Sequence, residues 1–104
     1  MARTAAPLPP VHPGEILREE FLVPFGLTPY ALAGAVGVPR TRIERLAREE
    51  TPVTADTALR LARYFGTSAE FWLNLQALHD VRVEEARLAG ELAAITPRAD
   101  ATAA

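Results

Sequence analysis

The segment between Thr28 and Leu46 constrains the fold more than any other part of this 104-residue chain. It holds two short stretches of helical spacing separated by Gly37, a residue that tolerates the positive φ of a tight turn. The small Ala33 lets a second helix cross close to the backbone of the first. The side chains of Ile43 and Leu46 would point from the second helix back to the first and fix the angle between the two helices. The segment therefore predicts two helices held at a fixed angle across a turn, which is the geometry of a helix-turn-helix.

Helix signals continue along the rest of the chain, and no segment alternates apolar and polar residues as a strand would. Thr28, Thr54 and Ser68 stand where N-caps are expected, while Gly37 and Gly66 stand where helices end. We expect five helices, over residues 13–23, 29–36, 39–49, 55–65 and 69 to about 94. The predicted core contains Val38, Ile43, Leu46, Ala58, Leu59, Leu61, Ala62, Phe65, Phe71, Trp72, Leu75 and Leu78.

Composition is that of one small globular domain. Hydrophobic residues make up 49% of the chain and charged residues 23%, which excludes a disordered or collagen-like protein. We expect an all-α domain over residues 12–95, preceded by a flexible Pro-rich arm (1–11) and followed by a disordered tail (96–104). The absence of cysteine excludes disulfide scaffolds and thiol catalysis. No apolar run has membrane-spanning length and no secretory signal begins the chain, so we expect a cytoplasmic protein without a membrane partner.

Basic charge is concentrated on one predicted helix, although the net charge of the chain is −2. All eleven basic residues are arginines, and Arg40, Arg42, Arg45 and Arg48 fall within nine residues. An isolated cluster of this kind is more often a solvated helix face. Here it lies on the second helix of the predicted helix-turn-helix, where DNA-binding folds place their contacts, and we therefore predict DNA binding.

Each predicted DNA-binding residue has a geometric role. Arg40 and Thr41 lie in the first turn of the second helix, which enters the major groove, and Arg45 follows one turn later. The fork of an arginine pairs with O6 and N7 of guanine, which gives about 1–3 kcal/mol of discrimination per contact. Thr28 can bring N–H groups and a hydroxyl to a phosphate, while Arg42 lies toward the flank. The predicted DNA-binding set is Thr28, Arg40, Thr41, Arg42, Arg45 and Arg48.

No arrangement of residues predicts catalysis or metal binding. His12 and His79 are the only histidines, and two histidines without further ligands do not make a metal site. Glu15, Glu19 and Glu20 form a charged helix face rather than a catalytic pair, and no glycine-rich loop could cradle a phosphate. We therefore expect no enzyme activity, no catalytic residue, no cofactor, no metal and no small-molecule ligand.

Three stretches of the sequence resemble one family. They are His12-Pro-Gly-Glu-Ile-Leu17, Gly26-Leu-Thr28 and the long stretch from Val53 to Gln76, within a match over about residues 11–95. The chain resembles the HigA antitoxin branch of the phage-repressor-like (XRE/Cro) helix-turn-helix family. The resemblance implies a five-helix fold with a long C-terminal helix and a dimeric repressor of its own toxin–antitoxin operon. It also implies a partner toxin resembling HigB, an mRNA-cleaving ribonuclease that the antitoxin neutralises.

One turn departs from the family pattern. Members usually follow the second helix with an Asn-Gly-Lys/Arg-like turn that contacts phosphates, whereas this chain has Arg48-Glu-Glu-Thr51. Glu49 and Glu50 would repel phosphate if they faced it. Either this turn points away from the DNA, or the affinity for DNA is weaker, or Arg48 substitutes for the missing contact. This leaves open an interaction module that binds a toxin but not DNA. A stand-alone XRE-type transcriptional regulator without a toxin partner is a further alternative.

Apolar residues extend along the last predicted helix beyond the needs of a small core. Val81, Leu88, Leu92 and Ile95 recur at helical spacing. They either form a partner surface or fold back on their own domain. We expect two copies to associate through this helix, which would place two recognition helices about 34 Å apart on an inverted-repeat operator.

Overall fold

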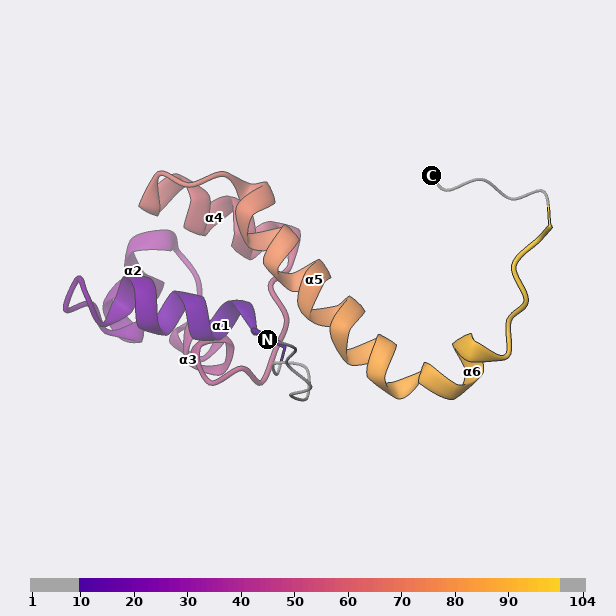
Figure 1. Ribbon diagram of the computed structural model, residues 1–104. Helices are drawn as coiled ribbons and strands as arrows, with labels where there is room; N and C mark the ends of the chain where they lie inside the picture. The colour runs from indigo at the N-terminus through magenta and orange to yellow at the C-terminus, as the bar shows by residue number, and fades with distance from the viewer. Residues whose placement is uncertain (1–9, 100–104) are drawn as a thin grey trace, which may run out of the picture.

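The computed structural model describes residues 10–99, and this part of the chain is helical without any strand (Figure 1). The predicted all-α class is therefore confirmed. Most of the predicted arm (residues 1–9) and the end of the predicted tail (100–104) lie outside the described residues. The helices are α1 (Pro13–Ile16), which continues into the π-helix η1 (Leu17–Leu22), α2 (Pro29–Val36), α3 (Arg40–Ala47), α4 (Ala55–Phe65), α5 (Ala69–Arg87) and α6 (Ala89–Ala93).

Side-chain caps begin three of these helices where the sequence predicts them. The hydroxyl oxygens of Thr28, Thr54 and Ser68 each accept a hydrogen bond from the backbone N–H three residues later. These bonds satisfy N–H groups that have no partner within the helix. The predicted starts of α2, α4 and α5 are therefore confirmed.

Glycines end two helices, and a proline shifts the start of a third. Gly37 and Gly66 adopt φ values of 75° and 76° after α2 and α4, in the left-handed region that residues with a Cβ disfavour. The predicted ends of α2 and α4 are confirmed. The prediction of 39–49 for the next helix was too long, because Pro39 is its N-cap in extended geometry and α3 ends at Ala47.

The core lies where α1, η1, α2, α3, α4 and the first half of α5 meet. Trp72 is fully buried, and its indole N–H donates a hydrogen bond to the hydroxyl of Thr67 at 2.8 Å. The other buried apolar residues come from four further helical segments and one loop, so that a single cluster joins the domain. They are Leu17, Leu22, Leu32, Ala33, Ile43, Leu46, Ala47, Val53, Ala58 and Leu61.

Three residues predicted in the core are exposed instead. Leu59 is 62% exposed, Leu78 is 52% exposed and Phe71 is 38% exposed. Neighbouring residues on a helix point about 100° apart. Because α4 and α5 each pack through one face, Ala58 and Trp72 occupy that face and their sequence neighbours Leu59 and Phe71 do not. Leu78 lies further along α5, where the helix leaves the domain.

The first helix changes to π-helical geometry, which the prediction of a plain helix over 13–23 missed. In η1 the hydrogen bonds join residues five apart, as between the N–H of Val23 and the carbonyl of Arg18 at 3.0 Å. This spacing brings Leu17 and Leu22 to the same side, and both are buried. Phe21 packs against α4 and α5. Its ring centroid lies 4.6 Å from that of Phe65 and 5.2 Å from that of Trp72.

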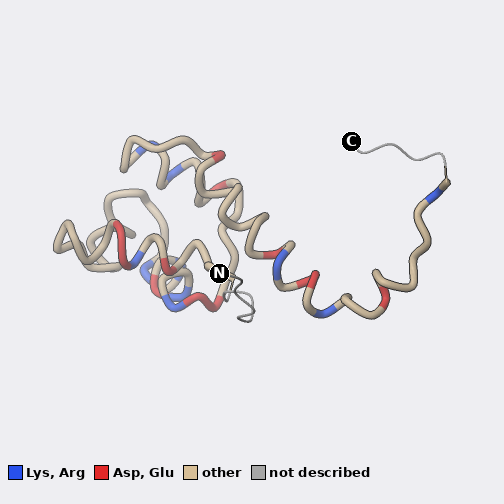
Figure 2. Tube along the Cα trace, in the orientation of Figure 1, with Lys and Arg blue, Asp and Glu red and all other residues tan. Residues whose placement is uncertain are grey.

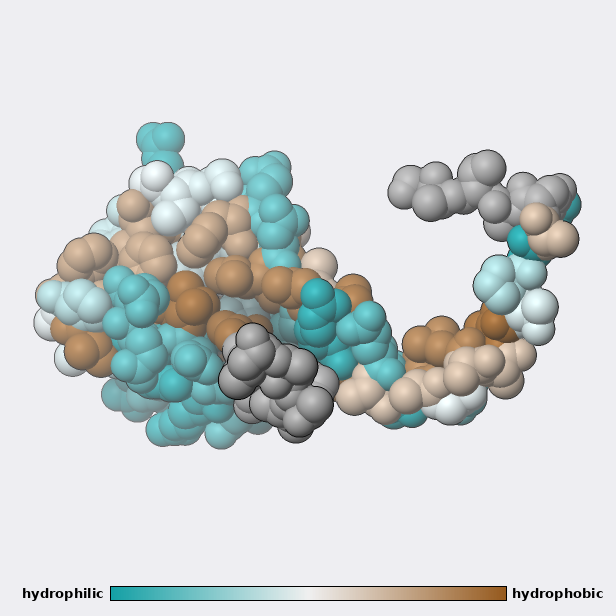
Figure 3. Space-filling view, in the orientation of Figure 1, coloured by the Kyte–Doolittle hydropathy of each residue, from teal (hydrophilic) through white to brown (hydrophobic). Residues whose placement is uncertain are grey.

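The second half of α5 projects from the domain as an arm (Figure 1). The helix predicted to run to about residue 94 breaks at Leu88, where α5 gives way to the short α6. Val81, Leu92 and Ile95 are 49%, 46% and 64% exposed, and Figure 3 shows apolar residues along the outer part of the arm. The alternative in which this stripe folds back on its own domain is therefore wrong. Within residues 10–99, no helix is long and apolar enough to cross a membrane.

Candidate nucleic-acid interface

The helices α2 and α3 meet through the small and apolar residues that the sequence singles out. Ala33 is buried between them, and its carbonyl accepts a hydrogen bond from the N–H of Gly37 at 2.9 Å. Ile43 and Leu46 are fully buried and hold α3 on the core. Val38, predicted to be buried under the turn, is only partly buried against the core. The predicted two-helix geometry is confirmed, and it leaves the opposite face of α3 open.

The open face of α3 carries the arginines of the cluster. The side chains of Arg40, Arg42 and Arg45 are 58%, 43% and 64% exposed, and Thr41 is exposed between them. Figure 2 shows basic residues gathered on α3, with acidic residues close by. This surface can therefore meet an anionic polymer without any rearrangement of the core.

Arg40 and Arg45 each lie beside a carboxylate that is near them in the sequence. The Nε of Arg40 lies 3.4 Å from Oε2 of Glu44, and the Nε of Arg45 lies 3.8 Å from Oε1 of Glu50. Exposed ion pairs of this kind contribute at most about 1 kcal/mol. A phosphate or a base edge can therefore still reach both guanidinium groups. Arg48 makes no ion pair within residues 10–99.

Arg42 belongs to a network that joins three helices. Its Nη1 donates to Oδ1 of Asp56 at 2.8 Å, and the Nε of Arg60 donates to the same oxygen at 2.7 Å. Nη1 of Arg60 also donates to the carbonyl oxygens of Val36 and Gly37, at 2.7 and 3.3 Å. The hydrogen bonds from Arg60 and Arg42 lower the pKa of the Asp56 carboxyl group. The network ties α3 and α4 to the C-terminus of α2.

The turn after α3 contains the two glutamates that depart from the family pattern. Glu49 adopts a φ of 64°, and the N–H groups of Glu49 and Glu50 donate to carbonyls three and five residues back. This is a helix end that favours glycine, and a residue with a Cβ costs about 1–2 kcal/mol there. Arg18 of η1 donates to the carbonyl of Ala47 at 2.5 Å and to Oε2 of Glu49 at 3.2 Å. The carboxylate of Glu49 is therefore partly neutralised by Arg18.

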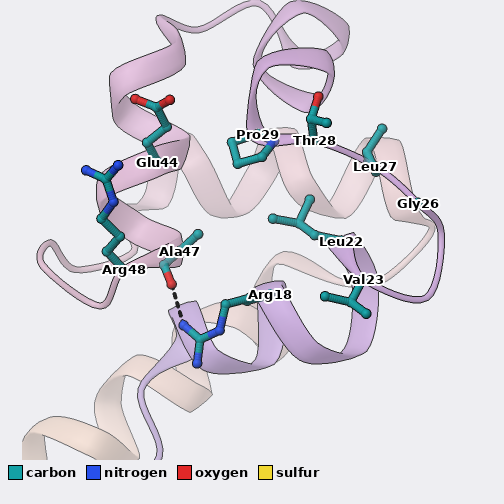
Figure 4. A pocket seen from close by; sticks show the side chains of 10 residues that line it. All are labelled: Arg18, Leu22, Val23, Gly26, Leu27, Thr28, Pro29, Glu44, Ala47 and Arg48. Carbon is teal, nitrogen blue, oxygen red and sulfur yellow. Dashed lines mark hydrogen bonds between the residues drawn. The ribbon is translucent and has the colours of Figure 1, made fainter.

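A groove of about 450 Å³ separates η1 and the following turn from the C-terminal end of α3 (Figure 4). Apolar side chains such as Leu22 and Leu27 line its interior. Thr28 borders it at the start of α2, and Arg48 borders it at the end of α3. The two residues expected to contact phosphates therefore stand on different walls of one groove.

The start of α1 presses directly against α3. Nδ1 of His12 accepts a hydrogen bond from the N–H of Gly14 at 2.9 Å and caps the helix. A Cβ on Gly14 would lie 1.8 Å from the carbonyl oxygen of Leu46, so only glycine fits. Burial, together with the nearby charge of His79, lowers the pKa of His12 and keeps it a neutral acceptor. Among residues 10–99, no group of three or more His, Asp or Glu side chains could hold a metal ion.

Sequence reasoning missed the residues that hold α3 in position. Arg18 contacts the end of α3 from η1, and Asp56 contacts Arg42 from α4. No local pattern links such distant positions. The one available signal was the spacing of Asp56 and Arg60, four residues apart as in a helical ion pair.

The fold and this surface together define a helix-turn-helix protein of the DNA-binding class, with α3 as the recognition helix. The family described as "Helix-turn-helix" matches residues 17–72, which is more than half of the chain. The chain belongs to this helix-turn-helix family, within its HigA-type branch.

Individual relatives agree with this assignment. The chain is 54% identical over 78 residues to virulence-associated protein I of Dichelobacter nodosus, with 75% of this chain and 72% of that protein covered. It is 44% identical over 72 residues to antitoxin HigA-1 of Vibrio cholerae, with 69% and 68% covered. The antitoxin HigA of Pseudomonas aeruginosa, solved with the higBA promoter, superposes with a TM-score of 0.81 at 44% identity, with 85% of this chain and 97% of that chain covered.

Proposed function

We propose that the chain is the antitoxin of a HigBA-like type II toxin–antitoxin system. It represses its own operon by binding operator DNA, and it neutralises an mRNA-cleaving toxin resembling HigB. The observation that carries this proposal is the exposed arginine face of α3, held on the core by Ile43 and Leu46. Relatives named or solved as HigA antitoxins, one of them with promoter DNA, support it. The role is non-enzymatic and cytoplasmic.

In this proposal the first turn of α3 enters the major groove. Arg40 and Thr41 contact base edges there, and Arg45 contacts a base one turn later. The terminal nitrogens of the two arginines match the O6 and N7 acceptors of guanine.

Phosphates are contacted from the two ends of this surface. The hydroxyl oxygen of Thr28 accepts from the N–H of Ala31 at 3.1 Å, which leaves the hydroxyl proton available for a phosphate oxygen. Arg48, which has no ion pair within residues 10–99, contacts the backbone from the end of α3. Arg42 contacts it at the flank, beside Asp56.

Two copies associate through the arm formed by the second half of α5 and α6. Leu78, Val81, Leu92 and Ile95 are exposed in the single chain and would be covered in a dimer. Twofold pairing places two recognition helices about 34 Å apart, so the operator is an inverted repeat.

Titration of the duplex directly upstream of the coding sequence tests the DNA-binding part. The logarithm of the affinity should fall with the logarithm of the salt concentration, with a slope of about −0.9 for each phosphate neutralised. An interaction module without DNA binding, which the Glu49–Glu50 turn favours, would give no specific shift. The pairing of Glu49 with Arg18 speaks against that alternative.

Co-expression with the neighbouring gene tests the antitoxin part. The expected result is a co-purifying complex in which mRNA cleavage by the neighbouring product is suppressed. A neighbouring product that neither binds the chain nor cleaves mRNA would identify a stand-alone transcriptional regulator instead.

A further inference from the structure

The two arginines proposed to contact bases are approached by carboxylates in the same way. In both Arg40 and Arg45 the atom closest to the carboxylate is Nε, at 3.4 Å from Glu44 and 3.8 Å from Glu50. Neither guanidinium group makes a hydrogen bond within residues 10–99. The two terminal nitrogens of each arginine are therefore available to a ligand.

The backbone fixes both carboxylates beside their arginines. Glu44 follows Arg40 by one helical turn, and its side chain is 29% exposed whereas that of Arg40 is 58% exposed. Glu44 thus lies at the foot of the longer Arg40 side chain. Glu50 is held at the helix end, because its N–H donates to the carbonyl of Arg45 at 2.9 Å.

Arg42 provides a contrast within the same helix. Its contact to Asp56 uses the terminal Nη1, at 2.8 Å. This bond occupies one of the two N–H groups of Nη1 and orients the guanidinium group of Arg42 toward α4. Arg40 and Arg45 thus have a carboxylate near Nε without a hydrogen bond, whereas Arg42 at the flank donates a hydrogen bond from a terminal nitrogen.

A carboxylate at Nε affects the two kinds of DNA contact differently. A guanine edge accepts two hydrogen bonds from the terminal nitrogens and carries no formal charge, so a carboxylate behind the fork remains compatible with it. A backbone phosphate is an anion, and the same carboxylate repels it at short range. Such a carboxylate therefore opposes phosphate contacts more than base contacts.

We propose that Glu44 and Glu50 are specificity-determining residues: they lie beside Nε of Arg40 and Arg45, leave the terminal nitrogens available to guanine, and oppose capture of the two arginines by backbone phosphates. The inference rests on the proposed DNA binding. In this role the two glutamates suppress binding to DNA of arbitrary sequence. Since non-specific binding comes almost entirely from phosphate contacts, this suppression raises the ratio of operator affinity to non-specific affinity.

The test uses the full chain and two fluorescent duplexes, the upstream DNA and a scrambled duplex of the same length and composition. Glu44→Gln, Glu50→Gln and the double variant are titrated by anisotropy at two salt concentrations. Glu70→Gln is the matched control. Glu70 is exposed in the first turn of α5, so this substitution removes the same charge at a site outside α2 and α3. Far-UV circular dichroism verifies that every variant is folded.

Each single variant should bind the scrambled duplex about threefold to tenfold more tightly and lose a similar factor of operator preference. The double variant should lose more of the operator preference than either single variant. Glu70→Gln should change the affinity for both duplexes equally and keep the wild-type preference. The role of Glu44 and Glu50 would be overturned if the double variant kept the wild-type operator preference, or if Glu70→Gln lost as much of that preference. Either result would leave the proposed DNA binding intact. A wild-type chain without any preference for the upstream duplex would instead overturn the proposed function, and this inference with it.

Discussion

Replacing Gly14 with alanine tests the contact that sets the position of α3. The added Cβ would lie 1.8 Å from the carbonyl oxygen of Leu46 and 3.1 Å from Nδ1 of His12. A Cβ atom essentially never lies closer than 3.0 Å to such an atom, so the start of α1 must withdraw from α3 by at least about 1.2 Å. The obstructing oxygen belongs to the backbone of α3 at the buried residue Leu46, and a backbone oxygen cannot rotate away as a side chain could.

The expected magnitude follows from opposing contributions. Alanine is favoured over glycine inside a helix by about 1 kcal/mol. Overpacking of this kind costs about 1–3 kcal/mol, and loss of the His12 cap costs about 1 kcal/mol more. Because the contact is with backbone, the overpacking cost should lie at its upper end. We expect Gly14→Ala to lower the free energy of unfolding by about 2–3 kcal/mol.

Urea unfolding monitored by far-UV circular dichroism measures this change. Gly34→Ala is the matched control, since Gly34 is also helical and no atom lies within 4 Å of the position that its Cβ would occupy. This variant should gain up to about 1 kcal/mol from helix propensity alone. The two substitutions should therefore act in opposite directions. A Gly14→Ala chain as stable as the wild type would refute the close contact between α1 and α3.

Three further predictions follow from other parts of the molecule. Arg40→Ala should lose about 1–3 kcal/mol of discrimination at one or two base pairs while keeping the fold, and unchanged operator affinity in a gel-shift titration would count against its role. Leu46→Asp should unfold the domain, because Leu46 is 1% exposed and an unpaired charge would be buried there; a wild-type melting curve would contradict this. The pKa of His12 is lowered from its ordinary value of 6.5, so the unfolded chain binds this proton more readily. The associated stability is therefore complete above about pH 6.5 and is lost as the pH falls toward the lower pKa of the folded state. Melting temperatures between pH 7.5 and 5 should show this loss, and His12→Asn, which keeps a capping acceptor, should reduce it.

Most of the helix positions could be predicted because their causes are local. Thr28 and Thr54 cap helices through their own hydroxyl groups, and Gly37 and Gly66 adopt conformations that few other residues tolerate. The turn between α2 and α3 likewise depends on residues within a short segment. These features do not require knowledge of which distant segments pack together.

The errors concern features that depend on packing between distant segments. Leu59 and Phe71 are apolar and lie in strongly helical stretches, yet they face solvent because α4 and α5 each pack through one side. The contacts of Arg18 and Asp56 with α3 are equally non-local. The half-buried position of Glu44 beside Arg40 is non-local as well, since it follows from the packing of α3 on the core.

Guanine methylation interference on the upstream DNA measures whether α3 enters the major groove, because N7 of guanine lies there. We expect interference in two clusters about 10 base pairs apart, one in each half of an inverted repeat. Arg40→Ala should abolish the interference at one guanine in each half-site. Strong binding without any interference at guanine N7 would contradict the insertion of α3 into the major groove.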